Sequence, residues 1–149
     1  MNNLLGHGTW VAVCDGRKAL LLENKGDAAL PNLKARDVME QENPPTHLQG
    51  TAPPGRIFSS QGNRRGATEQ TDFHDQAEHA FLRKVAERLD IVLNDEHIRA
   101  LVLVAPARAL GMLRPMLSAG VQKVLVAELD RDYVKLPLHQ IENHLKHLG

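Results

Sequence analysis

Residues 100–116, ALVLVAPARALGMLRPM, decide the fold of this chain. Leu101–Ala105 is an unbroken apolar run, rich in branched residues and much shorter than a membrane span, which is typical of a strand buried on both faces. Pro106 ends this run, and Ala107–Leu113 is predicted to be helical until Pro115 kinks or ends the helix. A buried strand that leads directly into a helix is half of a β-α-β unit.

The second half of that unit is predicted at residues 121–129, VQKVLVAEL, which form another apolar run. The two strands are expected to be parallel neighbours with a right-handed connection. Earlier in the chain, residues 9–14 read as a central strand, Asp15-Gly16 as a hairpin turn and residues 17–24 as the returning strand. Residues 33–39 are predicted to form a half-exposed edge strand, although Asp37 and Val38 break its alternation.

Two further helices are predicted from apolar residues at helical spacing. The longer one covers residues 73–93, with Asp72 as N-cap and Asn94-Asp95 as its end. Its buried stripe is expected to be Phe73, Ala77, Phe81, Val85, Leu89 and Val92. The last helix has Pro137 in its first turn, and its apolar face is Leu138, Ile141, Leu145 and Leu148.

A meander of three antiparallel strands followed by two β-α units is the plan of ribonuclease H-like folds. We therefore expect an α/β, three-layer structure with a five-stranded mixed sheet and helices on both faces. The first strand should lie centrally, beside Leu101–Ala105. The 149 residues suit a single domain that spans 1–149.

Composition excludes several classes of function. Lys plus Arg equals Asp plus Glu at 18 each, so no overall field attracts nucleic acid or anionic membranes. The lone cysteine, Cys14, cannot form an internal disulfide, and the first ten residues lack the features of an export signal. Since no run is long enough to span a membrane, the expectation is a cytoplasmic protein without membrane contact.

Residues 42–72 differ from the rest of the chain, with four prolines, four glycines and only three large apolar residues. We expect a long loop, which is either functional or simply an unstructured insertion. Its glycines and arginines are suited to phosphate contacts, and Arg108 adds charge nearby in the predicted fold. The candidate RNA- or partner-binding residues are Arg56, Gln61, Gly62, Arg64, Arg65 and Arg108.

Catalytic motifs are not found. A metal nuclease of the ribonuclease H type needs converging carboxylates, but the first strand has none and Asp15 is explained by its turn. His74 and His79 are five residues apart and diverge by about 140° on a helix, unlike the two histidines of HExxH. Surface helix explains the histidines of the last helix better than metal binding does. We expect no metal or cofactor, and whether the chain is an enzyme stays open.

The whole chain resembles the bacterial host attachment proteins, which are named for being required for attachment to host cells. The landmarks are Trp10-Val11, Asp15-Gly16, Gly55-Arg56, Phe58, Gly62, Arg65, residues 101–106, Leu110-Gly111, Leu113-Arg114, Glu128, Asp132 and Leu136-Pro137. That family is distantly similar to the middle domain of archaeal and eukaryotic class-1 release factors. In that domain a Gly-Gly-Gln loop between a strand and a long helix promotes peptidyl-tRNA hydrolysis on the ribosome.

The resemblance implies a ribosome- or tRNA-associated module whose insertion at residues 42–72 reaches RNA. Hydrolysis is not implied, because the insertion lacks Gly-Gly-Gln: Gln61-Gly62-Asn63 is a different tripeptide, in which glutamine precedes glycine. The alternative is a non-catalytic protein–protein module that acts indirectly in attachment to host cells. The sequence leaves both functions open, together with the identity of a protein partner and the oligomeric state.

Overall fold

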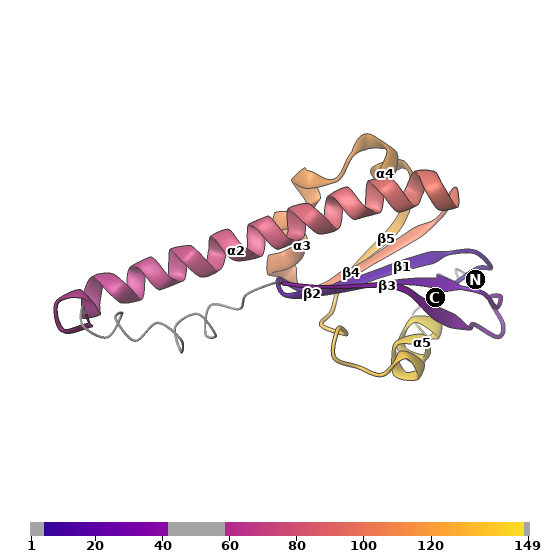
Figure 1. Ribbon diagram of the computed structural model, residues 1–149. Coiled ribbons are helices and arrows are strands. Elements are labelled where there is room, and N and C mark those ends of the chain that lie inside the picture. The colour runs from indigo at the N-terminus through magenta and orange to yellow at the C-terminus, as the bar shows by residue number, and fades with distance from the viewer. Residues whose placement is uncertain (1–4, 42–58, 148–149) are drawn as a thin grey trace.

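The computed structural model describes residues 5–41 and 59–147, and it describes the side chains of the long helix from Phe73 onward (Figure 1). Five strands, four α-helices and one 3-10 turn follow one another in these residues. In chain order they are β1 (Trp10–Cys14), β2 (Lys18–Asn24), β3 (Leu33–Glu40), α2 (Ser59–Glu96), β4 (Leu101–Ala105), α3 (Ala107–Leu113), η2 (Arg114–Met116), α4 (Ala119–Val124), β5 (Leu125–Asp130) and α5 (Leu138–Lys146).

The sheet has the order β3-β2-β1-β4-β5. β1 is antiparallel to β2 and parallel to β4, and β4 is parallel to β5. This confirms the predicted α/β class and the predicted mixed sheet, with β1 beside β4 at its centre. The order is the one expected of a ribonuclease H-like fold.

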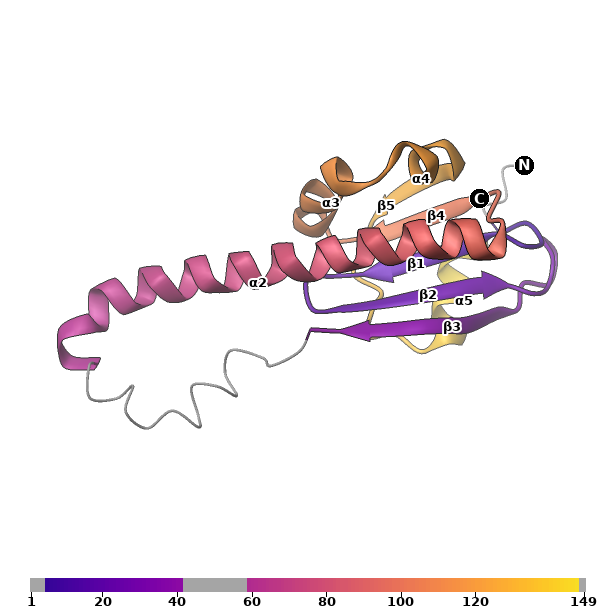
Figure 2. The same ribbon diagram turned by 45° about the horizontal axis from the view of Figure 1, so that its top comes forward.

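The sheet is covered on both faces because its central strands are apolar on both sides. Trp10, Ala12 and Cys14 of β1 pack with α2, α3 and α4, whereas Val11 and Val13 pack with α5 and the segment before it. Figures 1 and 2 show α2 to α4 on one side of the sheet and α5 on the other. All ten side chains of β1 and β4 are buried, as expected for strands without a solvent face.

The helix α2 begins at Ser59, so the predicted loop at residues 42–72 is wrong for residues 59–72, and Asp72 is not an N-cap. Residues 42–58, the rest of that prediction, lie outside the described residues. Phe73, predicted to be in the buried stripe, is 46% exposed, and burial begins at Phe81. Burial thus begins about two turns later than predicted, because the N-terminal part of α2 extends past the end of the sheet (Figure 2).

The predicted strand at residues 121–129 is also wrong for residues 121–124, which belong to the short helix α4 (Ala119–Val124). Ser118 explains the difference, because its Oγ accepts a hydrogen bond from the Val121 amide, as an N-cap does. The Ser118 hydroxyl in turn donates to Asp90 of α2 at 2.5 Å. β5 therefore starts only at Leu125, and Val121 is buried under α2 rather than in the sheet.

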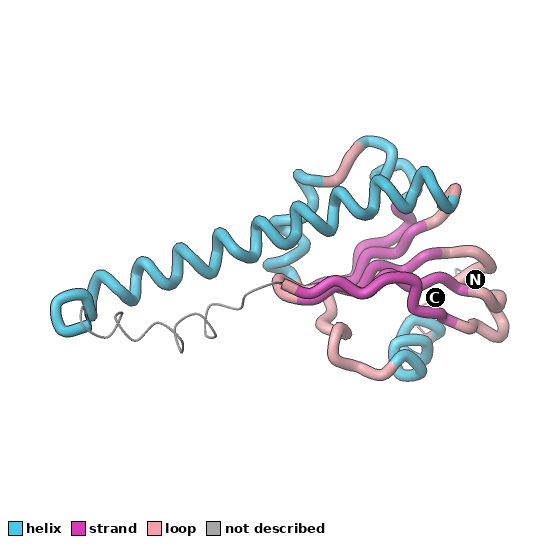
Figure 3. Tube along the Cα trace, in the orientation of Figure 1, coloured by secondary structure: helices cyan, strands magenta, loops and turns pink. Residues whose placement is uncertain are grey.

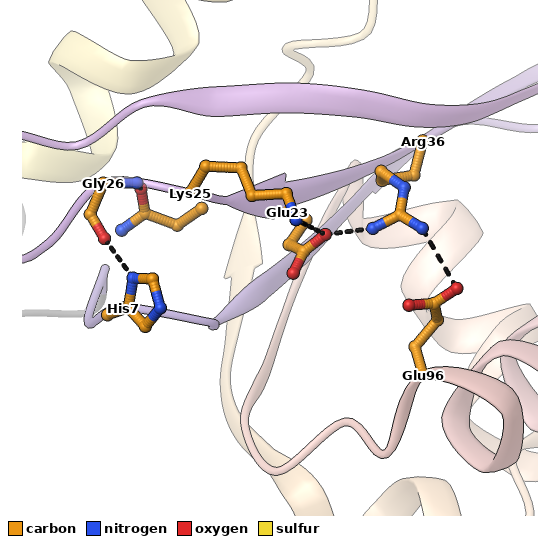
Figure 4. A network of polar contacts seen from close by, with 7 residues as sticks. His7, Glu23, Lys25, Gly26, Arg36 and Glu96 are labelled. Atoms are coloured by element: carbon orange, nitrogen blue, oxygen red, sulfur yellow. Dashed lines mark hydrogen bonds and ion pairs between the residues drawn. The ribbon is translucent and has the colours of Figure 1, made fainter.

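The edge strand β3 is present as predicted, and a bulge explains its broken alternation. Leu21 pairs with Asp37 but Leu22 pairs with Ala35, so Arg36 is the extra residue. Its guanidinium lies over the Trp10 ring, 5.1 Å from the centroid, and forms ion pairs with Glu23 and with Glu96 at the end of α2 (Figure 4). Together with the Asp37–Arg88 pair at 2.7 Å, Arg36 ties α2 to the sheet edge.

Figure 3 shows that the chain changes direction sharply after α2, before it enters β4. His97 occupies the position after the last helical residue, with φ of 52°, and the Ile98 amide donates to the Leu93 carbonyl at 3.2 Å. Glycine is favoured at this position because a Cβ is strained in the left-handed region. No helix in the described part of the chain is long and apolar enough to cross a membrane.

We predict that His97→Gly raises the free energy of unfolding by about 0.5–1 kcal/mol, because it relieves this left-handed strain at an exposed residue. His97→Ala is the matched control, since it removes the imidazole but keeps the Cβ. Urea unfolding of the three proteins measures the difference. If His97→Ala stabilises as much as His97→Gly, the strain is not the cause.

Candidate functional site

Four of the six predicted binding residues lie on the first turns of α2. Residues 59–74 of this helix, called the arm below, project beyond the end of the sheet in both views (Figures 1 and 2). From Ser59 to Asp75 a helix rises by about 24 Å. Gln61, Gly62, Arg64 and Arg65 therefore lie on a helical arm rather than on the predicted loop, and Arg56 lies outside the described residues.

A cleft of about 200 Å³ lies at the base of the arm, where β1 and β4 end. β1 continues to β2 on one side and β4 continues to β5 on the other, so this is the point at which the strand order reverses. Ligands of open α/β sheets characteristically bind at such a point, outside the carboxyl ends of the strands. The cleft is lined by Asp15, Gly16, Arg17, Glu78, Leu82, Pro106, Arg108, Ala109 and Met112.

Arg108, the sixth predicted residue, spans this cleft from α3 to α2. Its Nε donates to Glu78 at 3.0 Å, and its Nη2 forms an ion pair with Asp75. The two carboxylates are three residues apart and so lie on the same face of the helix. These hydrogen bonds and charges, those of Glu78 foremost, raise the pKa of Arg108. The guanidinium thus joins α2 to the first turn of α3 at the base of the arm.

Gly16, in the turn between β1 and β2, lies against the side chain of Glu78. A Cβ on this residue would lie 2.8 Å from the Glu78 Cγ, closer than two carbons approach without movement. The hairpin between β1 and β2 is therefore packed against the side chain that binds Arg108. A side chain at this position would therefore have to displace the Glu78 side chain.

Asp15 and Cys14, which precede Gly16 in the sequence, have structural roles. Asp15 Oδ1 accepts from the amides of Arg17 and Lys18, both at 2.8 Å, which is the turn role predicted for it. Cys14 is fully buried, and burial, followed by the charge of Asp15, raises the pKa of its thiol to about 12. A thiol with so high a pKa is a poor nucleophile.

Glu128 and Asp130, the other carboxylates considered for metal binding, do not join Asp15. Glu128 forms an ion pair with Arg114, the residue that follows α3, at 2.6 Å. Within residues 5–41 and 73–147, no three histidine, cysteine or acidic side chains are arranged to hold a metal ion.

The structure thus brings together one predicted residue, Arg108, with two that sequence reasoning did not assign to the site, Asp75 and Glu78. Their spacing of three along a helix was visible in the sequence. What the sequence could not show was that the first turn of α3 would lie beside them. The remaining predicted residues are on the arm or outside the described part.

The comparison with known proteins rests on the sequence of most of the chain and not on the residues of this cleft. A family model described as bacterial archaeo-eukaryotic release factor family 12 matches residues 8–145. No curated protein matches the chain. The match covers all five strands and every described helix apart from the end of α5.

We predict that Gly16→Ala releases Arg108 from Glu78, because the new Cβ displaces the glutamate side chain. The Arg108 Nε–H signal in ¹H–¹⁵N NMR spectra should shift, and its exchange with water should accelerate at least several-fold. Gly111→Ala is the matched control, since a Cβ there meets nothing within 4 Å. An unchanged Nε–H signal in Gly16→Ala would show that the hairpin does not position this ion pair.

We predict that native Cys14 resists alkylation by iodoacetamide at pH 8 and reacts readily once urea unfolds the chain. The folded thiol has a pKa of about 12, above the unfolded value of 9.0. Below pH 9 the thiol is therefore protonated in both states, and its burial contributes fully to the free energy of unfolding. That contribution is lost as the pH rises from 9 toward 12. Cys14→Ala, compared with the parent by urea unfolding across that window, should lose stability less steeply; equal slopes would contradict the prediction.

Proposed function

The chain belongs to bacterial archaeo-eukaryotic release factor family 12, and on this premise we propose that it is a translation-related module that binds the ribosome or tRNA through its arm. The arm and the segment before it carry Arg56, Gln61, Gly62, Arg64 and Arg65. In this proposal their contacts are mainly to phosphate. A cytoplasmic location follows from such a partner.

The observation that carries the proposal is the length of α2 beyond the sheet. A helical arm of about 24 Å is long enough to place its tip well away from the body of the protein. The sequence of residues 59–72, SSQGNRRGATEQTD, has no large apolar residue, so it offers little to a hydrophobic protein groove. Adjacent arginines on a single projecting helix are better suited to an RNA backbone, because guanidinium groups bind phosphate in a bidentate manner.

The attachments of α2 support the same proposal. Arg36 binds Glu96, Arg88 binds Asp37 at 2.7 Å, and Arg108 binds Glu78 and Asp75. These contacts are spread from the last turn of the helix to the base of the arm. Each exposed pair is weak by itself, but together with the buried stripe they fix the direction in which the arm leaves the sheet. We assign Arg108 this positioning role.

The proposal is one of binding and does not include hydrolysis. The sequence contains no Gly-Gly-Gln, and glutamine precedes glycine at Gln61-Gly62. At the cleft at the base of the arm, Arg108 is held in ion pairs with Asp75 and Glu78, and Asp15 is held in its turn. Should a protein partner prove to be the target, the chain would instead be an interaction module, acting in attachment to host cells as the sequence resemblance implies.

We predict that the full-length protein co-sediments with ribosomes at low salt and that Arg64→Ala/Arg65→Ala weakens this binding at least tenfold. Each lost phosphate contact removes released counterions, so the slope of log affinity against log salt should fall by about 1.5 for the double variant. Sedimentation at several salt concentrations, repeated with deacylated tRNA, measures both quantities.

The matched control is Arg99→Ala/Lys135→Ala, which removes two exposed positive charges from the body of the protein. It should bind as the parent does. Loss of binding in this control to the same extent as in the arm variant would mean that overall charge, and not the arm, is responsible. Ribosome binding that the arm variant leaves unchanged would overturn the proposal.

A further inference from the structure

A second cleft lies beside α5, the helix that covers the opposite face of the sheet (Figure 1). Its volume is about 550 Å³, within the range of small-molecule sites. It is lined by Arg131, Tyr133, Gln140, Asn143, His144 and His147. The described side chains around it are polar or aromatic, and none of those that line it is acidic.

The periodicity of α5 gathers most of these residues. Gln140, Asn143, His144 and His147 follow one another at spacings of three, one and three, which places them on a single stripe of a helix. Ile141 and Leu145, on the other side, are fully buried against the sheet. Because the apolar stripe fixes the rotation of the helix, the polar stripe is held facing the cleft.

An aromatic platform is already formed at this cleft. The rings of Tyr133 and His144 stack, with centroids 4.8 Å apart and planes 21° from parallel. Tyr133 is only 8% exposed, so it fixes the orientation of the exposed His144 ring. A flat, oriented ring at the mouth of a cleft can stack a second planar group on its other face.

Arg131 provides the charge. Its Nη1 donates to the Asp130 carbonyl at 2.8 Å, which leaves the rest of the guanidinium fork without an assigned partner. Like Arg17, Arg83 and Arg99, Arg131 forms no ion pair with the described residues, and among the described side chains that line this cleft it is the one arginine or lysine. Asp130 and Asp132 flank it in sequence, but their side chains do not line the cleft.

Hydrogen-bonding groups complete the lining. His147 Nδ1 lies 2.8 Å from the Asn143 carbonyl, so this nitrogen donates its hydrogen and Nε2 is directed elsewhere. The side-chain amides of Gln140 and Asn143 each carry donors and an acceptor, as the edges of nucleobases do. A divalent cation has no carboxylate ligand in this lining, whereas an anion with a planar polar group has a partner for each part.

We propose that this cleft binds a nucleotide, with the phosphate on Arg131, the base stacked on His144 and the base edge on the amides of α5. The shared chemistry is a nucleobase joined to a 5′-phosphate, either as a free mononucleotide or as the end of an RNA strand. The site lies across the sheet from the arm, and the inference does not depend on the arm binding RNA.

The test is titration of the ¹⁵N-labelled full-length protein with AMP, GMP, CMP and UMP, followed by NMR. At least one nucleotide should bind with a dissociation constant below 1 mM and shift amides of residues 131–147. Adenosine and inorganic phosphate, each lacking one half of the ligand, should bind at least tenfold more weakly. A 5′-phosphorylated oligonucleotide that binds more tightly than the mononucleotide would assign the ligand to an RNA end.

Arg131→Ala and His144→Ala should each weaken nucleotide binding at least tenfold. The matched control is His139→Ala, on the same helix but outside the cleft lining, and it should bind normally. All three substitutions are at exposed residues, and thermal unfolding checks that each variant is folded. No shift with any nucleotide at 10 mM, or binding that both cleft variants leave unchanged, would overturn the proposal.

Discussion

The pairing of β1 with β4 is the constraint on which the rest of the structure depends. Trp10 pairs with Leu101 and Val13 with Val104, and both strands are buried on both faces. Burying one such side chain contributes about 1.5–3 kcal/mol, so neither face can be left open to water. One face is therefore covered by α2, α3 and α4 and the other by α5.

This constraint also explains why α2 is only partly supported by the sheet. Its fully buried side chains, Leu82 and Val85 among them, begin several turns after Ser59, because the strands below are only five to eight residues long. A 38-residue helix extends well past a sheet of that size. The arm is thus a consequence of matching a long helix to short strands, and its base coincides with the carboxyl ends of β1 and β4.

The sequence predicted most of the fold because its strongest signals are apolar runs, and these mark burial directly. It failed at residues 59–72 and 121–124 for two different reasons. A helix that projects from the body needs no apolar stripe, so polar composition was read as a loop; the lack of proline between Pro54 and Pro106 was the available signal. At α4, branched residues suggested a strand, whereas the Ser118 cap and the cover provided by α2 favoured a helix. The partners of Arg108 could not be predicted at all, because they depend on how α3 lies against α2.

The charges at the base of the arm suggest how binding would be divided between the arm and the body. Arg108 lies between the carboxylates of Asp75 and Glu78, so its charge is already neutralised. A phosphate approaching Arg108 would meet the two carboxylates that already bind it. In the proposed function, contacts to an RNA backbone would be made by the arm, where Arg64 and Arg65 are adjacent in sequence, while Arg108 would act by fixing the helix that carries them. The cleft beside α5 differs in this respect. It is lined by Arg131, which forms no ion pair with a described residue.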